Sequence, residues 1–186
     1  MDEPLPDLDA FLPHPAVRTR HARTAAADAD ALWRAASEVR LTDTRTLGRV
    51  VRWRIPGTAA GQTYDAMFRG YPFTLLDEGP RHSVSGLCGR IWTLARDYPA
   101  LAGPEEFAAW AEPGTVRVLF GHWARPHGDG TAELCSEARV QPVDHAAAIR
   151  LRALWTLVGR FAPLVASEPL AIAARRAAEG ARRGAA

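Results

Sequence analysis

The sequence predicts an α+β domain in which a curved antiparallel sheet wraps around a long C-terminal helix. Three observations lead to this prediction: one early strand followed by two short helices, a series of alternating segments between residues 72 and 141, and a closing amphipathic segment that begins at Asp144. A sheet with one apolar face must bury that face against another layer. The closing helix is expected to supply this layer, with a cavity left between helix and sheet.

The composition is that of one folded domain. The chain has 186 residues, of which 47% are hydrophobic, and this is enough for one sizeable core. Its 23 basic and 21 acidic side chains give a net charge of +2, and so weak a charge predicts no nucleic-acid partner. Lysine and asparagine are absent and arginine supplies the positive charge, which indicates a GC-rich bacterial coding sequence.

The protein is expected to be cytoplasmic. Its first twenty residues begin acidic, contain four prolines and lack the basic start and apolar stretch of a signal peptide. No segment approaches the roughly 20 apolar residues of a membrane helix, so no membrane insertion is predicted. Cys88 and Cys135 are expected to be reduced and buried in this compartment.

The first strand and helix are expected near the N-terminus. Residues 17–24 alternate and contain β-branched side chains, which is typical of a strand. Asp28 or Asp30 can cap the helix that follows. Its apolar stripe consists of residues at helical spacing, namely Leu32, Trp33, Ala36 and Val39.

A second short helix is expected to begin at Thr42 or Asp43 and to end near residues 55–57, where proline and glycine interrupt the pattern. Residues 56–70 then have the composition of a loop. Three apolar side chains are expected to pack this loop against the core: Tyr64, Met67 and Phe68.

The middle of the chain has the two-residue period of strands. Strands are expected over residues 72–77, 81–92, 115–125 and 131–141, with a helical turn at 105–110. Gly86 and Gly89 indicate bends in the second of these strands. The Pro126–Gly130 segment contains Asp-Gly and predicts a tight hairpin connection.

The last part is expected to be helical. Asp144 can cap a helix that Pro163 kinks or ends, and a further helix is expected from Pro169 into a fraying tail. The expected domain organisation is a Pro-rich extension at 1–14, one domain at 15–168 and a helical tail at 169–186. The apolar face of the main helix is expected to contain Leu151, Leu154, Trp155, Val158, Phe161 and Val165.

Three short motifs in this order resemble a known superfamily. They are ALWRAA at residues 31–36, GRIW at 89–92 and GTAELCSEARV at 130–140. The chain resembles the START-like, or SRPBCC, superfamily, in particular a bacterial branch, over most of residues 15–165. The resemblance implies a helix-grip fold. It departs from the branch pattern at Ser136 and Ala138, where threonines are usual, and the superfamily includes binders, carriers and enzymes.

Alternation places several candidate ligand-binding residues on the inner face of the predicted hairpin. Val118, Phe120 and His122 share one face of its first strand, and Ser136 shares the matching face of the second. An imidazole inside a cavity could bind a ligand or move a proton. The alternative is a histidine that bonds a backbone carbonyl or lies in water.

Other candidates come from the 81–92 strand and the closing helix. His82, Arg90 and Trp92 share one face if that strand is regular, so Arg90 could hold a ligand oxygen and Trp92 could stack on a flat ligand. The alternative is a surface ion pair and a packed tryptophan. Trp155 is expected to form the floor of the cavity, and Glu137 and Arg139 are expected to point outward into solvent or form a cross-strand pair.

Three classes of function remain for this sequence. The leading hypothesis is a protein that binds a small hydrophobic or aromatic molecule between sheet and helix, with no cofactor. The second is an enzyme resembling polyketide cyclases, with His122 as acid or base and Arg90 steadying oxygen charge. The third is a protein-interaction module with an incidental pocket. No metal site is predicted because the histidines are scattered and neither His-Glu-x-x-His nor Cys-x-x-Cys occurs.

Overall fold

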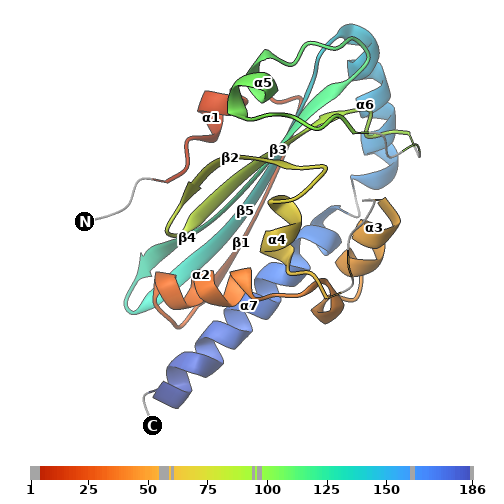
Figure 1. The fold of residues 1–186 in the computed structure, drawn as a ribbon. Helices are drawn as coiled ribbons and strands as arrows, with labels where there is room; N and C mark the ends of the chain where they lie inside the picture. Colours follow the sequence, from red (N-terminus) through yellow and green to blue (C-terminus); the bar gives the residue numbers. More distant parts are fainter. Residues whose placement is uncertain are drawn as a thin grey trace.

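The computed structural model describes residues 5–54, 59, 61–93, 95, 98–159 and 162–184. Its centre is a five-stranded antiparallel sheet with the strand order β1-β5-β4-β3-β2 (Figure 1). This sheet with its long C-terminal helix is the α+β helix-grip arrangement that the sequence predicts. The strands are β1 (Val17–Ala25), β2 (Thr74–Gly79), β3 (His82–Gly89), β4 (Val116–Gly128) and β5 (Thr131–Pro142).

The β4–β5 hairpin is the longest pairing of the sheet and fixes the orientation of the inner face. Asp129 has a φ of 49° and Gly130 a φ of 71°, the left-handed values that such a turn favours. Phe120 pairs with Ala138 and His122 with Ser136 across the two strands. Since directly opposed residues of an antiparallel pair share a face, the predicted inner face of this hairpin is confirmed.

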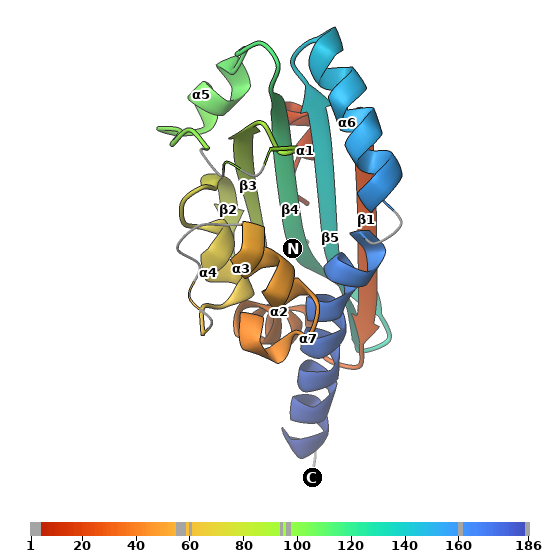
Figure 2. The ribbon, with the colours of Figure 1, turned by 90° about the vertical axis from the view of Figure 1, so that its right-hand side faces the viewer.

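One face of the sheet is covered by helices from both halves of the chain (Figure 2). The first of these helices is capped as predicted, because the carboxylate of Asp28 at its start accepts a hydrogen bond from the Ala31 amide at 2.6 Å. We call the face of the sheet that these helices cover the helix-facing side. The helices over it are α2 (Ala29–Ser37), the 3₁₀ helix η1 (Leu41–Asp43), α3 (Leu47–Arg54), α4 (Tyr64–Phe68), α6 (His145–Val158) and α7 (Ala162–Gly184).

The helix α4 corrects the expected loop at residues 56–70. Thr63 caps it by accepting the Ala66 amide at 3.1 Å, and Met67 and Phe68 are buried. Met67 and Phe68 therefore pack into the core as expected, but they do so from a helix and not from a loop. Residues 55–58, where the preceding helix was expected to end, lie outside the described residues.

The C-terminal helices also begin and end differently from the expectation. Helix α6 ends at Val158, and α7 runs from Ala162 through Pro169 to Gly184. Pro163 is the second residue of α7, a position where its missing N–H costs no hydrogen bond, so it begins a helix and does not end one. Phe161 and the side chains of Val158 and Val165 lie outside the description.

Helix α7 contributes more to the core than a fraying tail would. Leu170 and Ala173 are buried against α2 and the sheet, and Ala177, one turn further, is 4% exposed. In α6, Leu151 is buried and Trp155 is half-buried. Both α6 and α7 therefore pack against the sheet, where one long helix was expected.

The other face of the sheet is covered as well, by α1 (Leu8–Phe11) and α5 (Pro104–Ala109). Two strand glycines allow these helices to approach. A Cβ at Gly121 would lie 2.8 Å from a Leu8 methyl carbon, and one at Gly86 would lie 2.5 Å from the Phe107 ring. Gly86 is thus a site of close approach, and Gly89, with a φ of 135°, marks the end of β3.

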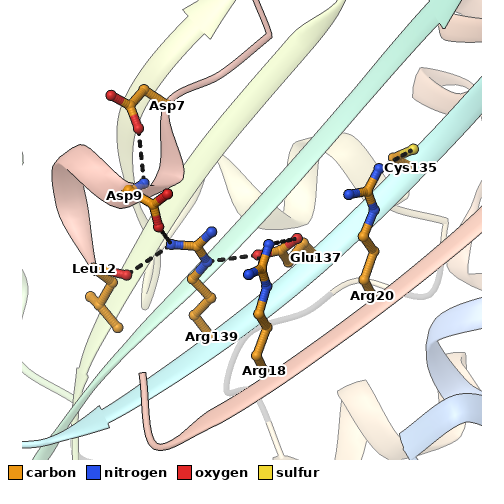
Figure 3. A network of polar contacts seen from close by, with 8 residues as sticks. All are labelled: Asp7, Asp9, Leu12, Arg18, Arg20, Cys135, Glu137 and Arg139. Atoms are coloured by element: carbon orange, nitrogen blue, oxygen red, sulfur yellow. Dashed lines mark hydrogen bonds and ion pairs between the residues drawn. The ribbon is translucent and has the colours of Figure 1, made fainter. Parts of the chain in front are cut away.

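A buried ion network lies between α1 and the sheet (Figure 3). The Arg139 guanidinium donates to Glu137 at 2.7 Å, to the Leu12 carbonyl at 2.8 Å and to Asp9. Arg18 pairs with Glu137 at 2.8 Å. Glu137 and Arg139 are 1% and 3% exposed, so the expectation of a solvated face is wrong, whereas the alternative, a cross-strand pair, is present between Arg18 of β1 and Glu137 of β5. The sequence pattern gave the correct face, but α1 covers that face. We call Asp9, Arg18, Glu137 and Arg139 the ion network.

Candidate functional site

Four polar side chains form a row across the helix-facing side of the sheet. Ser83 of β3 pairs with His122 of β4, His122 pairs with Ser136 of β5, and Ser136 pairs with His21 of β1. Opposed residues of antiparallel strands point to the same face, so all four point toward the helices. We call Ser83, His122, Ser136 and His21 the polar row.

Helix α4 lies directly over the middle of the polar row. The Phe68 ring centroid is 4.7 Å from that of His122, and the Tyr64 centroid is 5.2 Å away in an edge-on arrangement. Phe68 also contacts Phe120 at 5.0 Å. The aromatic residues of α4 therefore exclude bulk water from His122, which is 8% exposed.

Several polar atoms on this side of the sheet have no hydrogen-bond partner among the described residues. They are Nε2 of His21, Nε2 of His122 and the hydroxyl oxygens of Ser83 and Ser85. Ser85 pairs with Phe120 and so lies on the same side as the row. A buried polar atom without a partner costs about 1–3 kcal/mol, and most such atoms in native proteins are bonded to protein or water.

Burial sets the charge of His122. Loss of solvation lowers the pKa of its imidazole from 6.5 to about 4, and Asp65 opposes this shift only in part. The ring is therefore neutral at pH 7, with one nitrogen donating and the other accepting hydrogen bonds. Burial, followed by the neighbouring Arg23, also lowers the pKa of His21.

The side chains of Tyr64 and Ser136 form a hydrogen bond. Burial raises the pKa of the Tyr64 phenol, and its hydrogen bond with Ser136 acts in the opposite direction. Tyr64 is therefore a neutral phenol at physiological pH. Because Ser136 has this partner, it differs from Ser83 in the same row.

A small pocket lies where α2, α4 and α7 meet over His122. Its volume is about 30 Å³, enough for about two water molecules, and it is partly open to solvent. The lining side chains are mostly apolar or aromatic: Trp33, Ala36, Ser37, Tyr64, Asp65, Phe68, His122, Leu134, Cys135, Pro169 and Leu170.

A larger pocket, also partly open to solvent, lies between β1 and α6. Its volume is about 290 Å³, close to the lower limit of about 300 Å³ for small-molecule sites. Val17 of β1 and Leu151 and Trp155 of α6 form its apolar walls, together with Ala16 and Ala148. Arg152 and Thr156 complete the lining.

The two pockets use different parts of the same face. Val17 pairs with Val140, which pairs with Val118, and Val118 is four residues before His122. Four strand residues span about 13 Å. The structure thus places Val118, Phe120, His122 and Ser136 on one face, as the sequence predicts, but Trp155 lines the larger cavity and His122 the smaller one.

His82 lies on the opposite face, which corrects its placement with the cavity residues. It pairs with Trp123, whose ring packs in the core under α1 and α5. Its Nε2 lies 3.2 Å from the Asp77 carboxylate. The neighbouring Ser83 points to the helices instead, so a register one residue away from the expected one would have identified the polar row.

Arg90 and Trp92 follow the end of β3, so strand alternation does not extend to them. Arg90 is exposed and lies 3.8 Å from Glu112. Gly89 pairs with Val116, six residues or about 20 Å along the strand from His122. Trp92 is half-buried, with the Arg150 guanidinium 6.0 Å from its ring centroid. The structure therefore does not bring Arg90 together with His122.

Sequence reasoning missed His21 and Ser83 as site residues and treated Tyr64 only as packing. The sequence does carry a signal for α4: Thr63 can cap a helix, and an acidic residue and apolar side chains at helical spacing follow it. His21 and Ser83 carry no such local signal, because only the pairing register of β1 with β5 and of β3 with β4 places them beside His122.

The described residues contain no group of three or more His, Cys, Asp or Glu side chains arranged to hold a metal ion. Among the helices that the structure describes, none has the length and apolar character needed to cross a membrane. Both Cys88 and Cys135 are buried and unbridged.

Comparison with known proteins gives two similar solved structures. One is the TTHA0849 protein from Thermus thermophilus, with 12% identity over 88% of this chain and 99% of the other, at a TM-score of 0.36. The second is the Zhui aromatase/cyclase from Streptomyces sp. R1128, with 15% identity over 86% of this chain and 94% of the other, at a TM-score of 0.33. No family model and no curated protein sequence matches the chain. At these TM-scores the likenesses assign no function, and the helix-grip arrangement rests on the strand order and helix positions described above.

Proposed function

We propose that this chain is a START-like ligand-binding protein that holds a small, mostly apolar or aromatic molecule between the sheet and its C-terminal helices. The observation that carries the proposal is the cavity of about 290 Å³ between β1 and α6. Its Val17, Leu151 and Trp155 walls suit an apolar molecule, since small-molecule sites are concave and predominantly hydrophobic. A flat ring can stack against the indole.

The other two classes of function have less support. A cyclase mechanism with His122 and Arg90 acting on one substrate is not proposed, because Arg90 follows Gly89, whose partner Val116 lies about 20 Å along the strand from His122. The interaction-module hypothesis requires a contiguous exposed apolar patch. The exposed large apolar side chains of the described residues belong to four separate segments: Leu5, Val50, Tyr71, and Ile149 with Leu157.

The proposal is tested by filling the cavity from α6. Ala148 lines the cavity, so Ala148→Leu should occupy ligand space, whereas Ala153→Leu adds the same group at an exposed position of the same helix. Naphthalene serves as the probe, and binding is measured by calorimetry with a thermal-shift check of folding. We expect wild type and Ala153→Leu to bind naphthalene alike and Ala148→Leu to bind it about tenfold more weakly.

Two results would contradict the proposal. One is wild-type protein that does not bind naphthalene. The other is Ala148→Leu protein that is folded and binds naphthalene as tightly as Ala153→Leu does.

A further inference from the structure

We propose that the pocket between β1 and α6 takes aromatic molecules that carry a carboxylate, and that Arg152 binds this negative group where the pocket opens to solvent. This assignment rests on the proposed function, because it names the class of ligand for the same pocket. Three observations support it: the burial of the lining residues around α6, the absence of an ion pair at Arg152, and the charge of the two elements that form the walls.

The lining residues of α6 change from buried to exposed around the helix. Ala148, Leu151, Arg152, Trp155 and Thr156 all line the pocket, and their spacing of three and four residues places them on one side of the helix. Leu151 is buried, Trp155 is half-buried, and Arg152 and Thr156 are exposed. The pocket is therefore apolar at its inner end and polar at its open side. A ligand that suits both ends has an apolar body and a polar group.

Arg152 is a cation without a carboxylate partner among the described residues. Other arginines form ion pairs, such as Arg69 with Asp65. The Thr156 hydroxyl donates to the backbone carbonyl of Arg152 at 2.9 Å, so its proton is already used within the helix. The charged donor of the described lining is thus the Arg152 guanidinium, whose planar set of N–H groups matches the two oxygens of a carboxylate.

The two elements that form the pocket also favour a negative ligand. Neither β1 nor α6 contains an acidic residue, whereas both contain arginines. The neighbouring strand β5 carries Glu137, but this carboxylate lies on the opposite face of the sheet and is bound to Arg18 and Arg139. A cationic ligand would meet like charge in this pocket, and an anionic ligand would meet opposite charge. Because Arg152 is exposed, a carboxylate beside it keeps contact with water and avoids the cost of full burial.

Three probes with the same ring system test this assignment by calorimetry at pH 7. Naphthoate carries a negative charge, naphthamide has nearly the same shape without the charge, and naphthylmethylamine carries a positive charge, all with the substituent at the same ring carbon. We expect wild-type protein to bind naphthoate about fivefold more tightly than naphthamide, the ratio that an exposed ion pair provides. It should bind the amine more weakly than the amide. The preference for naphthoate should decrease at about 1 M salt, because salt screens exposed charges.

Three variants locate the contact. Arg152→Gln removes the charge and should bind naphthoate and naphthamide alike, with the affinity for naphthalene unchanged. Arg152→Glu reverses the charge and should prefer naphthylmethylamine to naphthoate. Arg150→Gln is the matched control, because it removes the same charge from the same helix. The Arg150 guanidinium lies 6.0 Å from the Trp92 ring centroid and is outside the described lining of the pocket, so this variant should keep the preference for naphthoate.

The assignment is overturned if wild-type protein binds naphthalene but binds naphthoate no better than naphthamide. It is also overturned if Arg152→Gln keeps the preference for naphthoate, or if Arg150→Gln loses as much of this preference as Arg152→Gln does. In each of these outcomes the pocket still binds an aromatic molecule and the proposed function stands. Wild-type protein that binds neither naphthalene nor naphthoate would contradict the proposed function and this assignment together.

Discussion

The two faces of the sheet bury different kinds of polar side chain: the face under α1 holds a fully bonded charged pair, although the Trp123 indole nitrogen there has no partner among the described residues. On the face under α1, Glu137 and Arg139 are almost fully buried, and both are bonded within the ion network. On the helix-facing side, Ser83, Ser85 and His122 are equally buried, but polar atoms of all three lack a partner. The two groups lie on different strands of the sheet, since Glu137 and Arg139 belong to β5, Ser83 and Ser85 to β3 and His122 to β4.

This difference separates charged groups that hold the fold together from neutral polar groups that contribute little to it. A buried charge must be paired, or its desolvation destabilises the folded state. The ion network meets this requirement and holds α1 against the sheet. In the polar row, Ser83 and His122 leave hydrogen-bonding capacity unused, and this costs stability in a buried site.

The largest loss of stability is expected when one member of the ion network is removed. Arg139→Met leaves Glu137, which is 1% exposed, with the exposed Arg18 as its remaining partner. We expect a loss of about 3 kcal/mol in the free energy of unfolding, the lower end of the cost of breaking a buried ion pair, measured by urea denaturation. The double variant Glu137→Leu/Arg139→Met removes both charges and should recover much of this loss. A single variant within about 1 kcal/mol of wild type would contradict the structural role.

The pH dependence of stability tests whether His122, on the helix-facing side, is buried in its neutral form. The pKa of His122 is lowered from 6.5 to about 4 by burial, so the unfolded state binds more protons between these values. Stability should therefore fall as the pH is lowered from 6.5 to 4, by about 3 kcal/mol from this residue. Urea denaturation of wild type and His122→Phe across this range isolates the effect. Identical pH profiles of the two proteins would show that His122 is not buried in its neutral form.

Gly121→Ala tests whether α1 is closely fitted to the sheet. The added Cβ would lie 2.8 Å from a Leu8 methyl carbon, so α1 must shift. The expected cost is about 1–3 kcal/mol, together with faster amide exchange of the Asp9 and Leu12 amides. Unchanged exchange at these two amides would mean that the α1 contact is looser than described.

A pair of buried hydroxyls gives the smallest expected effects. Thr115 is 2% exposed, accepts from the Trp110 indole at 2.9 Å and donates to the Glu112 carbonyl at 2.6 Å. Thr115→Val should cost about 1–2 kcal/mol, because these bonds are lost. Ser83→Ala removes a hydroxyl that has no partner and should leave thermal stability unchanged or slightly higher. Equal losses in the two variants would contradict the distinction between partnered and unpartnered groups.

The sequence predicted those parts of the fold that depend on local pattern. The alternation of residues 115–125 and 131–141 gave the inner face, because strand side chains alternate strictly. It could not show what covers the outer face. Glu137 and Arg139 follow a pattern typical of solvent-exposed residues, and only the docking of a segment more than a hundred residues away makes them buried.

The candidate site was predictable to the extent that it lies on one hairpin. His122 and Ser136 follow from alternation within the β4–β5 pair. Ser83 and His21 depend on the register of two further pairings, and a shift of one residue exchanges the faces of a strand. For this reason His82 was expected where Ser83 lies, and Arg90 was expected in a strand that ends at Gly89.

The most direct test of the central claim is the free energy of unfolding of His122→Phe at pH 7. If the imidazole is buried without a partner for its Nε2, an aromatic ring of similar shape should leave the protein as stable as wild type or more stable. A loss of more than about 1 kcal/mol would mean that the imidazole makes bonds that hold the fold together, and the helix-facing side would then resemble the opposite face.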